Sequence, residues 1–218
     1  MYHSIFLIGF RATGKSTIGK RLAQKLGWAF LDTDEIIKEK SGTSINTLTK
    51  NGTNWLEFRQ LEHNVIMELL HKRNLVVSVG GGAPVTDFVQ PQSGKPFGEL
   101  NAALFKDRTK TLTILLTADE NILEERMRAF EMASAEPTRP PLDKESATRL
   151  AEELKKYEGN PQKQKELVTD EIIKNSMDHL VLRKPLYAAL TDKVIDTGKC
   201  TLDNCVEEIL EFFNTTSA

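Results

Sequence analysis

The chain of 218 residues contains 39% hydrophobic and 28% charged residues, a composition typical of folded globular proteins and unlike that of disordered ones. With 29 basic against 31 acidic residues, its formal net charge is −2, so no overall field would draw nucleic acid or an anionic membrane to it. We therefore expect one compact domain over residues 1–218, a monomer that does not bind nucleic acid. Because no segment has the length of a signal-peptide core or a membrane helix, we also expect a cytoplasmic protein with no membrane as partner.

Short apolar runs rich in β-branched residues alternate with longer amphipathic stretches, a pattern typical of βα units around a parallel sheet. The expected strands are 4–9, 28–31, 74–79, 111–116 and 193–196. After the first strand, Ile18, Leu22 and Leu26 recur at helical spacing. Two further helices are expected at about 54–72 and 119–130. The sequence thus predicts an α/β fold, a three-layer α/β/α sandwich.

The segment that follows the first strand reads G-x-x-x-x-G-K-S from Gly9 to Ser16. The two glycines, Gly9 and Gly14, allow backbone N–H groups to turn inward around phosphate oxygens, at the positive end of the following helix. Lys15 can then reach the β- and γ-phosphates, and the Ser16 hydroxyl can ligate Mg²⁺. The motif and its context predict an ATP-dependent phosphotransferase.

The second expected strand ends in Asp32-Thr33-Asp34. In an extended segment, residues two apart point the same way, so both carboxylates are expected to face the phosphate loop. One can support the metal and its waters, and the other can accept a hydrogen bond or a proton from a substrate hydroxyl. Asp34 or its neighbour is also suited to cap the helix that follows.

Gly80, Gly81 and Gly82 follow the third expected strand, and Arg59 lies on the helix before it. Glycines at this edge of a sheet favour a close approach of a ligand to bare backbone, with a simple tight turn as the alternative. Arg59 considered alone would more often be a surface charge.

Two segments depart from the alternation of strands and helices. Residues 86–100, which carry prolines and glycines, are expected to form an irregular surface loop. Residues 136–177 begin with prolines, continue with mixed charges and contain almost no aromatic residues. For this segment we expect solvated helices and a mobile flap, that is, a flexible lid with an inserted helical segment at about 133–178.

Neither the cysteines nor the histidines show the spacing of a zinc site. Cys200 and Cys205 lie five positions apart, which matches neither a C-x-x-C redox motif nor paired zinc ligands. Reduced thiols, usual in a cytosolic protein, are the expectation. The histidines are scattered without an i, i+4 pair, so we expect no protein-bound zinc.

Taken together, the motifs resemble those of the shikimate kinase family and occur in that family's order. The matching segments are the phosphate loop with Ser16-Thr17-Ile18-Gly19, the pair Asp32 and Asp34, Phe58 to Glu62, Gly80 to Ala83, Arg139-Pro140, and Arg183 to Tyr187. The resemblance implies a nucleoside-monophosphate-kinase-like fold with a five-stranded parallel sheet in the order 2-3-1-4-5. It also implies transfer of the γ-phosphate of ATP to the 3-hydroxyl of shikimate in chorismate biosynthesis, with Mg²⁺ as cofactor.

The resemblance further implies a role for each matching residue. The implied ATP site consists of Ala12, Thr13, Gly14, Lys15, Ser16, Thr17, Arg126 and Arg139. The implied shikimate site consists of Asp34, Arg59, Gly81 and Arg183. The implied catalytic residues are Lys15, Asp32, Asp34 and Arg139. Mg²⁺ would be held by Ser16 directly and by Asp32 through water.

Two arginines and one alanine of this set need comment. Arg139 would close with the lid and place positive charge on the transferring phosphate. Arg126 would lie near the nucleotide base, with a helix-surface ion pair as the alternative. Ala12 stands where the family commonly has glycine, and the segment between Arg139 and Arg183 is longer than the family would lead us to expect.

Two other functions remain open at this point. A related kinase acting on another polyol acid, such as gluconate, would share the phosphate loop but would not need Arg59, Gly81 and Arg183. A nucleotide-binding module without turnover would also retain the loop. The joint presence of Lys15, Asp32, Asp34 and Arg139 favours an active enzyme.

Overall fold

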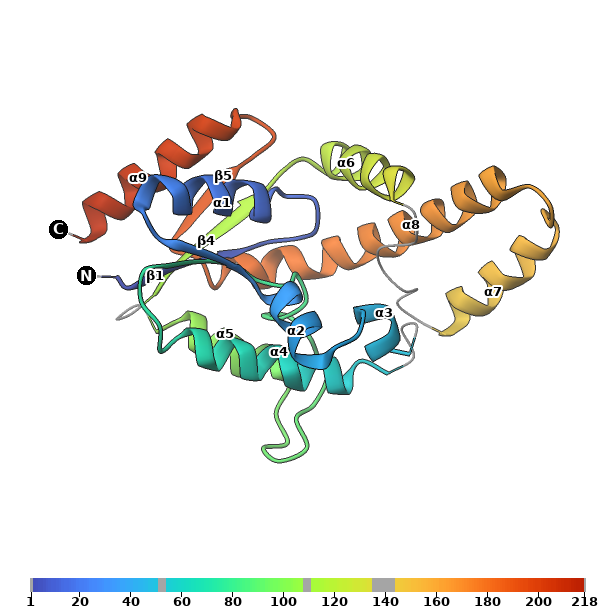
Figure 1. The fold of residues 1–218 in the computed structure, drawn as a ribbon, viewed down its shortest axis with the longest axis horizontal. Coiled ribbons are helices and arrows are strands. Elements are labelled where there is room, and N and C mark those ends of the chain that lie inside the picture. Colours follow the sequence, from blue (N-terminus) through green and yellow to red (C-terminus); the bar gives the residue numbers. More distant parts are fainter. Residues whose placement is uncertain (1, 51–53, 108–110, 135–143, 218) are drawn as a thin grey trace.

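The computed structural model describes residues 2–50, 54–107, 111–134 and 144–217. A five-stranded parallel sheet lies at its centre, with the strand order β2-β3-β1-β4-β5 (Figure 1). The strands are β1 Ser4–Ile8, β2 Ala29–Asp32, β3 Leu75–Ser78, β4 Thr111–Thr117 and β5 Lys193–Asp196. The helices are α1 Lys15–Leu26, α2 Thr33–Ser41, α3 Ile45–Leu48, α4 Leu56–Leu69, α5 Phe97–Phe105, α6 Glu120–Ala133, α7 Lys144–Lys155, α8 Pro161–Ala188 and α9 Leu202–Ser217. The predicted fold class and strand order are confirmed.

Side chains of the central strand β1 alternate between the two faces of the sheet. Ile5 and Leu7 pack into a buried cluster with residues of α1 and α9. Phe6 and Ile8 pack into a second cluster with residues of α4 and the C-terminal end of α8. Because successive strand residues point to opposite faces, an apolar central strand needs helices on both sides. Figure 1 shows α1 and α9 above the sheet and α4 and α5 below it.

The segment 86–100 is only partly irregular. Its first part is a loop closed by an antiparallel bridge between Val89 and Pro96. From Phe97 onward the chain is helical, so the expectation of a surface loop as far as residue 100 is wrong. Gly98 permits the helix to lie there, because a Cβ at this position would be 2.4 Å from a backbone carbonyl oxygen.

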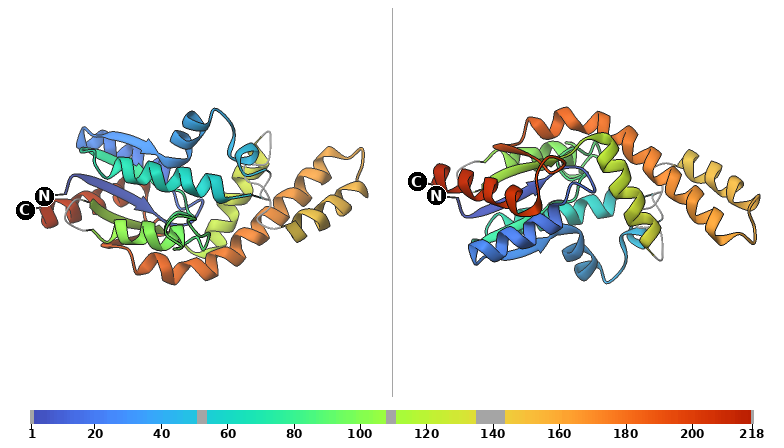
Figure 2. Two further views of the ribbon diagram at one scale, coloured as in Figure 1. Left: turned by 90° about the horizontal axis from the view of Figure 1, so that it is seen from below. Right: turned by 90° about the horizontal axis from the view of Figure 1, so that it is seen from above.

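The charged segment after α6 forms a helical hairpin of α7 and α8 that extends away from the sheet (Figure 2). Ion pairs of 2.6 Å join Arg128 of α6 to Asp170 of α8, and Arg149 of α7 to Glu171 of α8. The segment is helical, but α8 is not solvated throughout, because Ile172 and Ile173 on it are buried. Its motion as a lid stays a prediction, and residues 135–143 lie outside the described part of the chain.

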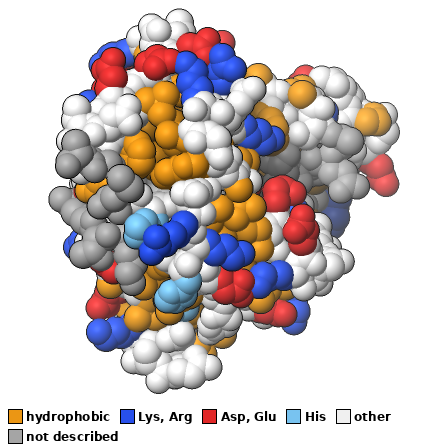
Figure 3. Space-filling model, turned by 60° about the vertical axis from the view of Figure 1, so that its left-hand side comes forward, with side chains coloured by type: hydrophobic (Ala, Val, Ile, Leu, Met, Phe, Trp, Pro, Cys, Tyr) orange, Lys and Arg blue, Asp and Glu red, His pale blue; other side chains and the backbone are white. Residues whose placement is uncertain are grey.

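Charges of both signs lie close together on the molecular surface. Figure 3 shows basic and acidic side chains interspersed over one face. On the surface as a whole, ion pairs such as Lys40–Glu68 and Lys193–Glu208 join charges of opposite sign. Among the described residues, no helix is both long enough and apolar enough to cross a membrane.

Candidate active site

The phosphate loop connects β1 to α1, as the sequence predicted. Gly9 has a φ of 140° and Gly14 a φ of 89°, values that favour glycine. A Cβ on Gly9 would also lie 2.3 Å from the carbonyl oxygen of Leu116, so no side chain fits there. Ala12 has a φ of 62°. An alanine in this left-handed region costs about 1 kcal/mol, which is a physical reason for a glycine at this position in related sequences.

Lys15 and Ser16 begin α1 and are held by hydrogen bonds. Lys15 Nζ donates to the carbonyl oxygens of Gly9 over 3.0 Å and of Phe10 over 2.8 Å. Ser16 Oγ donates to Asp32 Oδ2 over 2.9 Å. An ammonium group, a hydroxyl and the positive end of a helix therefore meet at one place, which suits a bound polyphosphate.

The two predicted carboxylates, Asp32 and Asp34, lie near the phosphate loop but on different elements. Asp32 ends β2 and caps α2, because its Oδ1 accepts the backbone N–H of Asp34 over 3.0 Å. Asp34 lies in the first turn of α2, so the expectation that both residues belong to one extended segment is wrong. Both residues still line the cavity over the phosphate loop.

That cavity has a volume of about 1070 Å³. It lies between the phosphate loop, the ends of β2 and β3, α6 and the segment that follows β5. The predicted ATP-site residues that line it are Ala12, Thr13, Gly14, Lys15, Ser16, Thr17 and Arg126. Arg139, the remaining predicted member, lies outside the residues that the structure describes.

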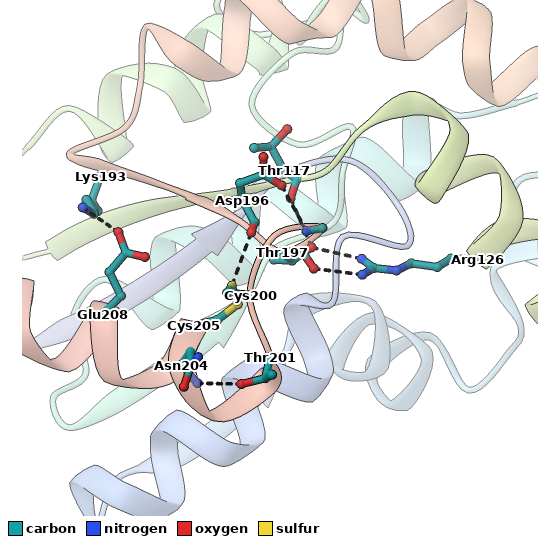
Figure 4. The surroundings of a disulfide bond; sticks show 11 residues. Thr117, Arg126, Lys193, Asp196, Thr197, Cys200, Thr201, Asn204, Cys205 and Glu208 are labelled. Atoms are coloured by element: carbon teal, nitrogen blue, oxygen red, sulfur yellow. Dashed lines mark hydrogen bonds and ion pairs between the residues drawn. A yellow bond between two sulfur atoms is a disulfide. The ribbon is translucent and has the colours of Figure 1, made fainter.

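Arg126 connects the phosphate loop to the segment after β5 (Figure 4). Its Nη1 donates to Thr197 Oγ1 over 3.0 Å and to the carbonyl oxygen of Ala12 over 3.4 Å. Its Nη2 donates to the carbonyl oxygen of Thr197 over 2.9 Å. These partners are neutral oxygens and not carboxylates, so the described contacts do not match the alternative of a helix-surface ion pair.

Figure 4 also shows a disulfide bond between Cys200 and Cys205, at the edge of the same cavity. The expectation of two reduced thiols is therefore wrong. Cys200 lies just before α9 and Cys205 in its first turns, which brings their Cα atoms to 5.8 Å, within the range that a disulfide spans. The five-residue spacing matched no redox motif, and the pairing depends on where α9 begins.

Loss of this disulfide is expected to lower the free energy of unfolding by about 2 kcal/mol, because a crosslink over so short a loop restricts the unfolded chain only modestly. Urea unfolding of Cys200→Ser and Cys205→Ser measures the change. The wild-type protein reduced by a dithiol is the matched control and should agree with both variants. Variants as stable as the oxidised protein would show that the crosslink does not stabilise the fold.

A second cavity, of about 70 Å³, lies beside the first. The residues predicted to bind the acceptor all line it, namely Asp34, Arg59, Gly81 and Arg183. Arg59 is only 7% exposed, and its Nη1 donates to Glu62 Oε2 over 2.6 Å. Its guanidinium lies 5.1 Å from the ring centres of Trp55 and Phe58. Arg59 is therefore a buried, held cation and not the surface charge that it would be in isolation.

The glycine run packs against these buried side chains. A Cβ on Gly80 would lie 2.4 Å from Glu62 Oε1, and one on Gly82 would lie 2.3 Å from Arg59 Nη2. The Ala83 N–H also donates to the carbonyl oxygen of Gly80 over 3.0 Å, which closes a tight turn. The protein's own side chains and the turn thus favour glycine at positions 80 and 82, and contact with a ligand stays a prediction for Gly81.

Arg183 reaches this cavity from the C-terminal part of α8. Burial lowers the pKa of its guanidinium, while the neighbouring Tyr187 hydroxyl and the Glu62 carboxylate act in the opposite direction. An arginine remains charged at neutral pH after such a shift. The cavity therefore presents two guanidinium groups, from Arg59 and Arg183, to any anionic acceptor.

A family model described as shikimate kinase matches residues 11–214. The curated shikimate kinase of Syntrophus aciditrophicus is 32% identical over 212 residues, which are 97% of this chain and 91% of that protein. This chain belongs to the shikimate kinase family. The curated shikimate kinase of Francisella tularensis subsp. novicida is 29% identical over 214 residues, 96% of this chain and 93% of that protein. Shikimate kinases transfer a phosphoryl group from ATP to shikimate.

Solved shikimate kinase structures have the same fold. The enzyme from Acinetobacter baumannii in complex with shikimate has a TM-score of 0.69 at 23% identity, covering 99% of this chain and 95% of that one. The enzyme from Bacteroides thetaiotaomicron has a TM-score of 0.67 at 24% identity, covering 97% and 98%.

In this shikimate kinase family member, the sequence analysis did not predict several residues that line the smaller cavity. They are Arg11, Asn175, Ser176 and His179. Arg11 forms an ion pair with the buried carboxylate of Glu131 and donates from Nη1 to Ser176 Oγ over 3.1 Å. Positions 175 and 179 precede Arg183 by two turns and one turn of a helix, which is the signal that could have identified them.

Proposed function

We propose that this chain transfers the γ-phosphoryl group of ATP to the 3-hydroxyl of shikimate. The observation that carries the proposal is that the two cavities meet. Asp34, Gly80, Gly81 and Arg11 line both of them. A nucleotide in the larger cavity would thus present its terminal phosphate to an acceptor in the smaller one, with the carboxylate of Asp34 between them. Such positioning is the main requirement of phosphoryl transfer.

The residues at the phosphate loop fit Mg²⁺. Ser16 Oγ and Asp32 Oδ2 are 2.9 Å apart, and hydroxyl and carboxylate oxygens are ligands that Mg²⁺ accepts. In the described part of the chain, no cluster of three or more His, Cys, Asp or Glu forms a metal cage. Kinases commonly hold Mg²⁺ with one or two protein oxygens, water and the phosphates. We assign Ser16 as a direct ligand and Asp32 as a ligand through water, and the ion would neutralise charge on the β- and γ-phosphates.

On the acceptor side, Arg59 and Arg183 would bind the carboxylate of shikimate by charge-assisted hydrogen bonds. Gly81 would contact the substrate through its backbone. Asp34 would accept the hydrogen bond of the reacting hydroxyl and take its proton. Arg139 is proposed to place its charge on the transferring phosphate, on the basis of its position in the family motif.

The direct test is to incubate the purified protein with ATP, Mg²⁺ and either shikimate or gluconate. ADP release and a phosphorylated product seen by mass spectrometry with shikimate would support the proposal. Turnover of gluconate alone would identify a kinase for another polyol acid. Binding of nucleotide and shikimate without ADP release would identify a binding module.

Replacing Arg183 by alanine is expected to raise the KM for shikimate about tenfold or more while leaving the KM for ATP within about twofold, because the guanidinium contacts the acid and not the nucleotide. Lys184→Ala is the matched control, since Lys184 is exposed on the same helix and pairs with Glu120. Calorimetry with each ligand measures the same contrast. Equal weakening of both ligands would contradict the assignment of Arg183.

Arg59→Ala is a less clean test of the same site. Removing this cation takes away the buried ion pair with Glu62, so the variant is also expected to lose about 3 kcal/mol of stability. Its kinetics should therefore be measured only where circular dichroism shows a folded protein.

The expectations of a monomer, of a cytoplasmic location and of a lid at about 133–178 stay part of this proposal. Size-exclusion chromatography with light scattering tests the first. Hydrogen exchange with and without both substrates tests the lid, and slow exchange across 144–160 in the free protein would identify a packed addition instead.

A further inference from the structure

Tyr187 lies in the last turn of α8 and is 2% exposed. Its Oη donates a hydrogen bond to the carbonyl oxygen of Gly81. The same hydroxyl interacts electrostatically with the Arg183 guanidinium, one helical turn earlier. Tyr187 thus lies next to Arg183 and Gly81, two residues of the proposed acceptor site, without lining the cavity itself.

The chemistry of the three groups sets the direction of these hydrogen bonds. A carbonyl oxygen can only accept, so the single hydrogen of the Tyr187 hydroxyl goes to Gly81. The lone pairs of the same oxygen remain for the Arg183 guanidinium, which can only donate. Tyr187 thus lies next to both Arg183 and Gly81, and its one hydrogen is committed to Gly81.

Gly81 lies close to both Tyr187 and the phosphate loop. A Cβ built on Gly81 would lie 3.7 Å from Tyr187 Oη, 3.3 Å from the carbonyl oxygen of Gly9 and 3.8 Å from the backbone nitrogen of Arg11. A shift of this glycine would therefore change the separation between the acceptor and the phosphate.

We infer that Tyr187 is a positioning residue for phosphoryl transfer, which fixes the Arg183 guanidinium and the Gly81 backbone so that the acceptor is aligned with the phosphate loop. The inference rests on the acceptor site proposed above. Tyr187 acts through these two residues and does not itself touch the reacting atoms.

The protonation state of the hydroxyl agrees with this role. Burial raises the pKa of Tyr187 to about 12, and the charge of Arg183 only partly offsets the effect. The hydroxyl accordingly keeps its hydrogen, and remains a donor to Gly81, at any pH used to assay the enzyme.

The test is Tyr187→Phe, which removes only the hydroxyl. We expect the KM for shikimate to rise about tenfold and kcat to fall, while the KM for ATP stays within about twofold. Tyr2→Phe, in the segment before β1 and outside both cavities, is the matched control and should change neither constant. A purely structural role would lower the melting temperature and leave both shikimate constants within about twofold, and that result would overturn the inference.

A double-mutant cycle separates the two contacts. If Tyr187 acts through Arg183, the effect of Tyr187→Phe on the KM for shikimate should shrink in the Arg183→Ala background. An undiminished effect would remove Arg183 from the inference. Calorimetry of shikimate with each variant keeps the test independent of turnover: wild-type protein that binds shikimate without phosphorylating it would refute the proposed function, whereas equal shikimate affinity of wild type and Tyr187→Phe would refute the role of Tyr187.

Discussion

Lys15→Met is expected to lower kcat by at least a factor on the order of 10³. The Lys15 ammonium group would neutralise the negative charge that develops on the β- and γ-phosphates during transfer, and methionine carries no charge. In the structure the same group donates to the carbonyl oxygens of Gly9 and Phe10, so it also holds the loop in shape before nucleotide binds. Steady-state kinetics with saturating ATP and shikimate measures the loss.

The control for this variant is Lys20→Met, on the exposed side of the same helix, which should retain normal turnover. Urea unfolding should show only a small destabilisation of Lys15→Met, of about 1 kcal/mol, from the two lost hydrogen bonds. A Lys15→Met enzyme with turnover close to that of the wild type would be incompatible with the assigned site.

Asp34→Asn is expected to reduce kcat by about 10²- to 10⁴-fold, since an amide has nearly the shape of the carboxylate but is no longer a base for the reacting hydroxyl. The KM for ATP should change little. An Asp34→Asn enzyme with turnover close to that of the wild type would argue against a base at position 34.

Asp32→Asn is the partner experiment, because asparagine caps a helix about as well as aspartate does. The cap of α2 by Asp32 should therefore survive and the fold should stay stable. The expected change is a higher Mg²⁺ concentration for half-maximal activity. An unchanged Mg²⁺ titration would show that the roles of Asp32 and Asp34 are divided wrongly.

Much of the fold follows from local patterns in the sequence. The apolar residues of β1 are followed at once by the phosphate-loop glycines, and this pairing of a buried strand with a loop and a helix occurs in few architectures. Gly14 has a left-handed φ and Gly9 has no space for a side chain, so both positions need glycine and could be predicted from the motif.

The parts that were wrong depend on contacts between distant segments. The cap at Asp32 starts α2 at Thr33, two residues earlier than an extended segment through Asp34 allows, so Asp34 lies on a helix. A side chain at position 82 would meet the buried Arg59, 23 positions away in the chain. The salt bridge of Arg11 with Glu131 depends likewise on how α6 lies against the loop. No local pattern contains these distances.

Helix α8 runs from the hairpin to the smaller cavity as one helix. Its 28 residues span about 42 Å, with the hairpin partner α7 near one end and Arg183 and Tyr187 near the other. One helix therefore joins the charged hairpin to the wall of the smaller cavity. We expect an engineered binding protein that clamps α7 onto α8 to alter the affinity for the acceptor, and calorimetry of shikimate with and without the binder would measure the change.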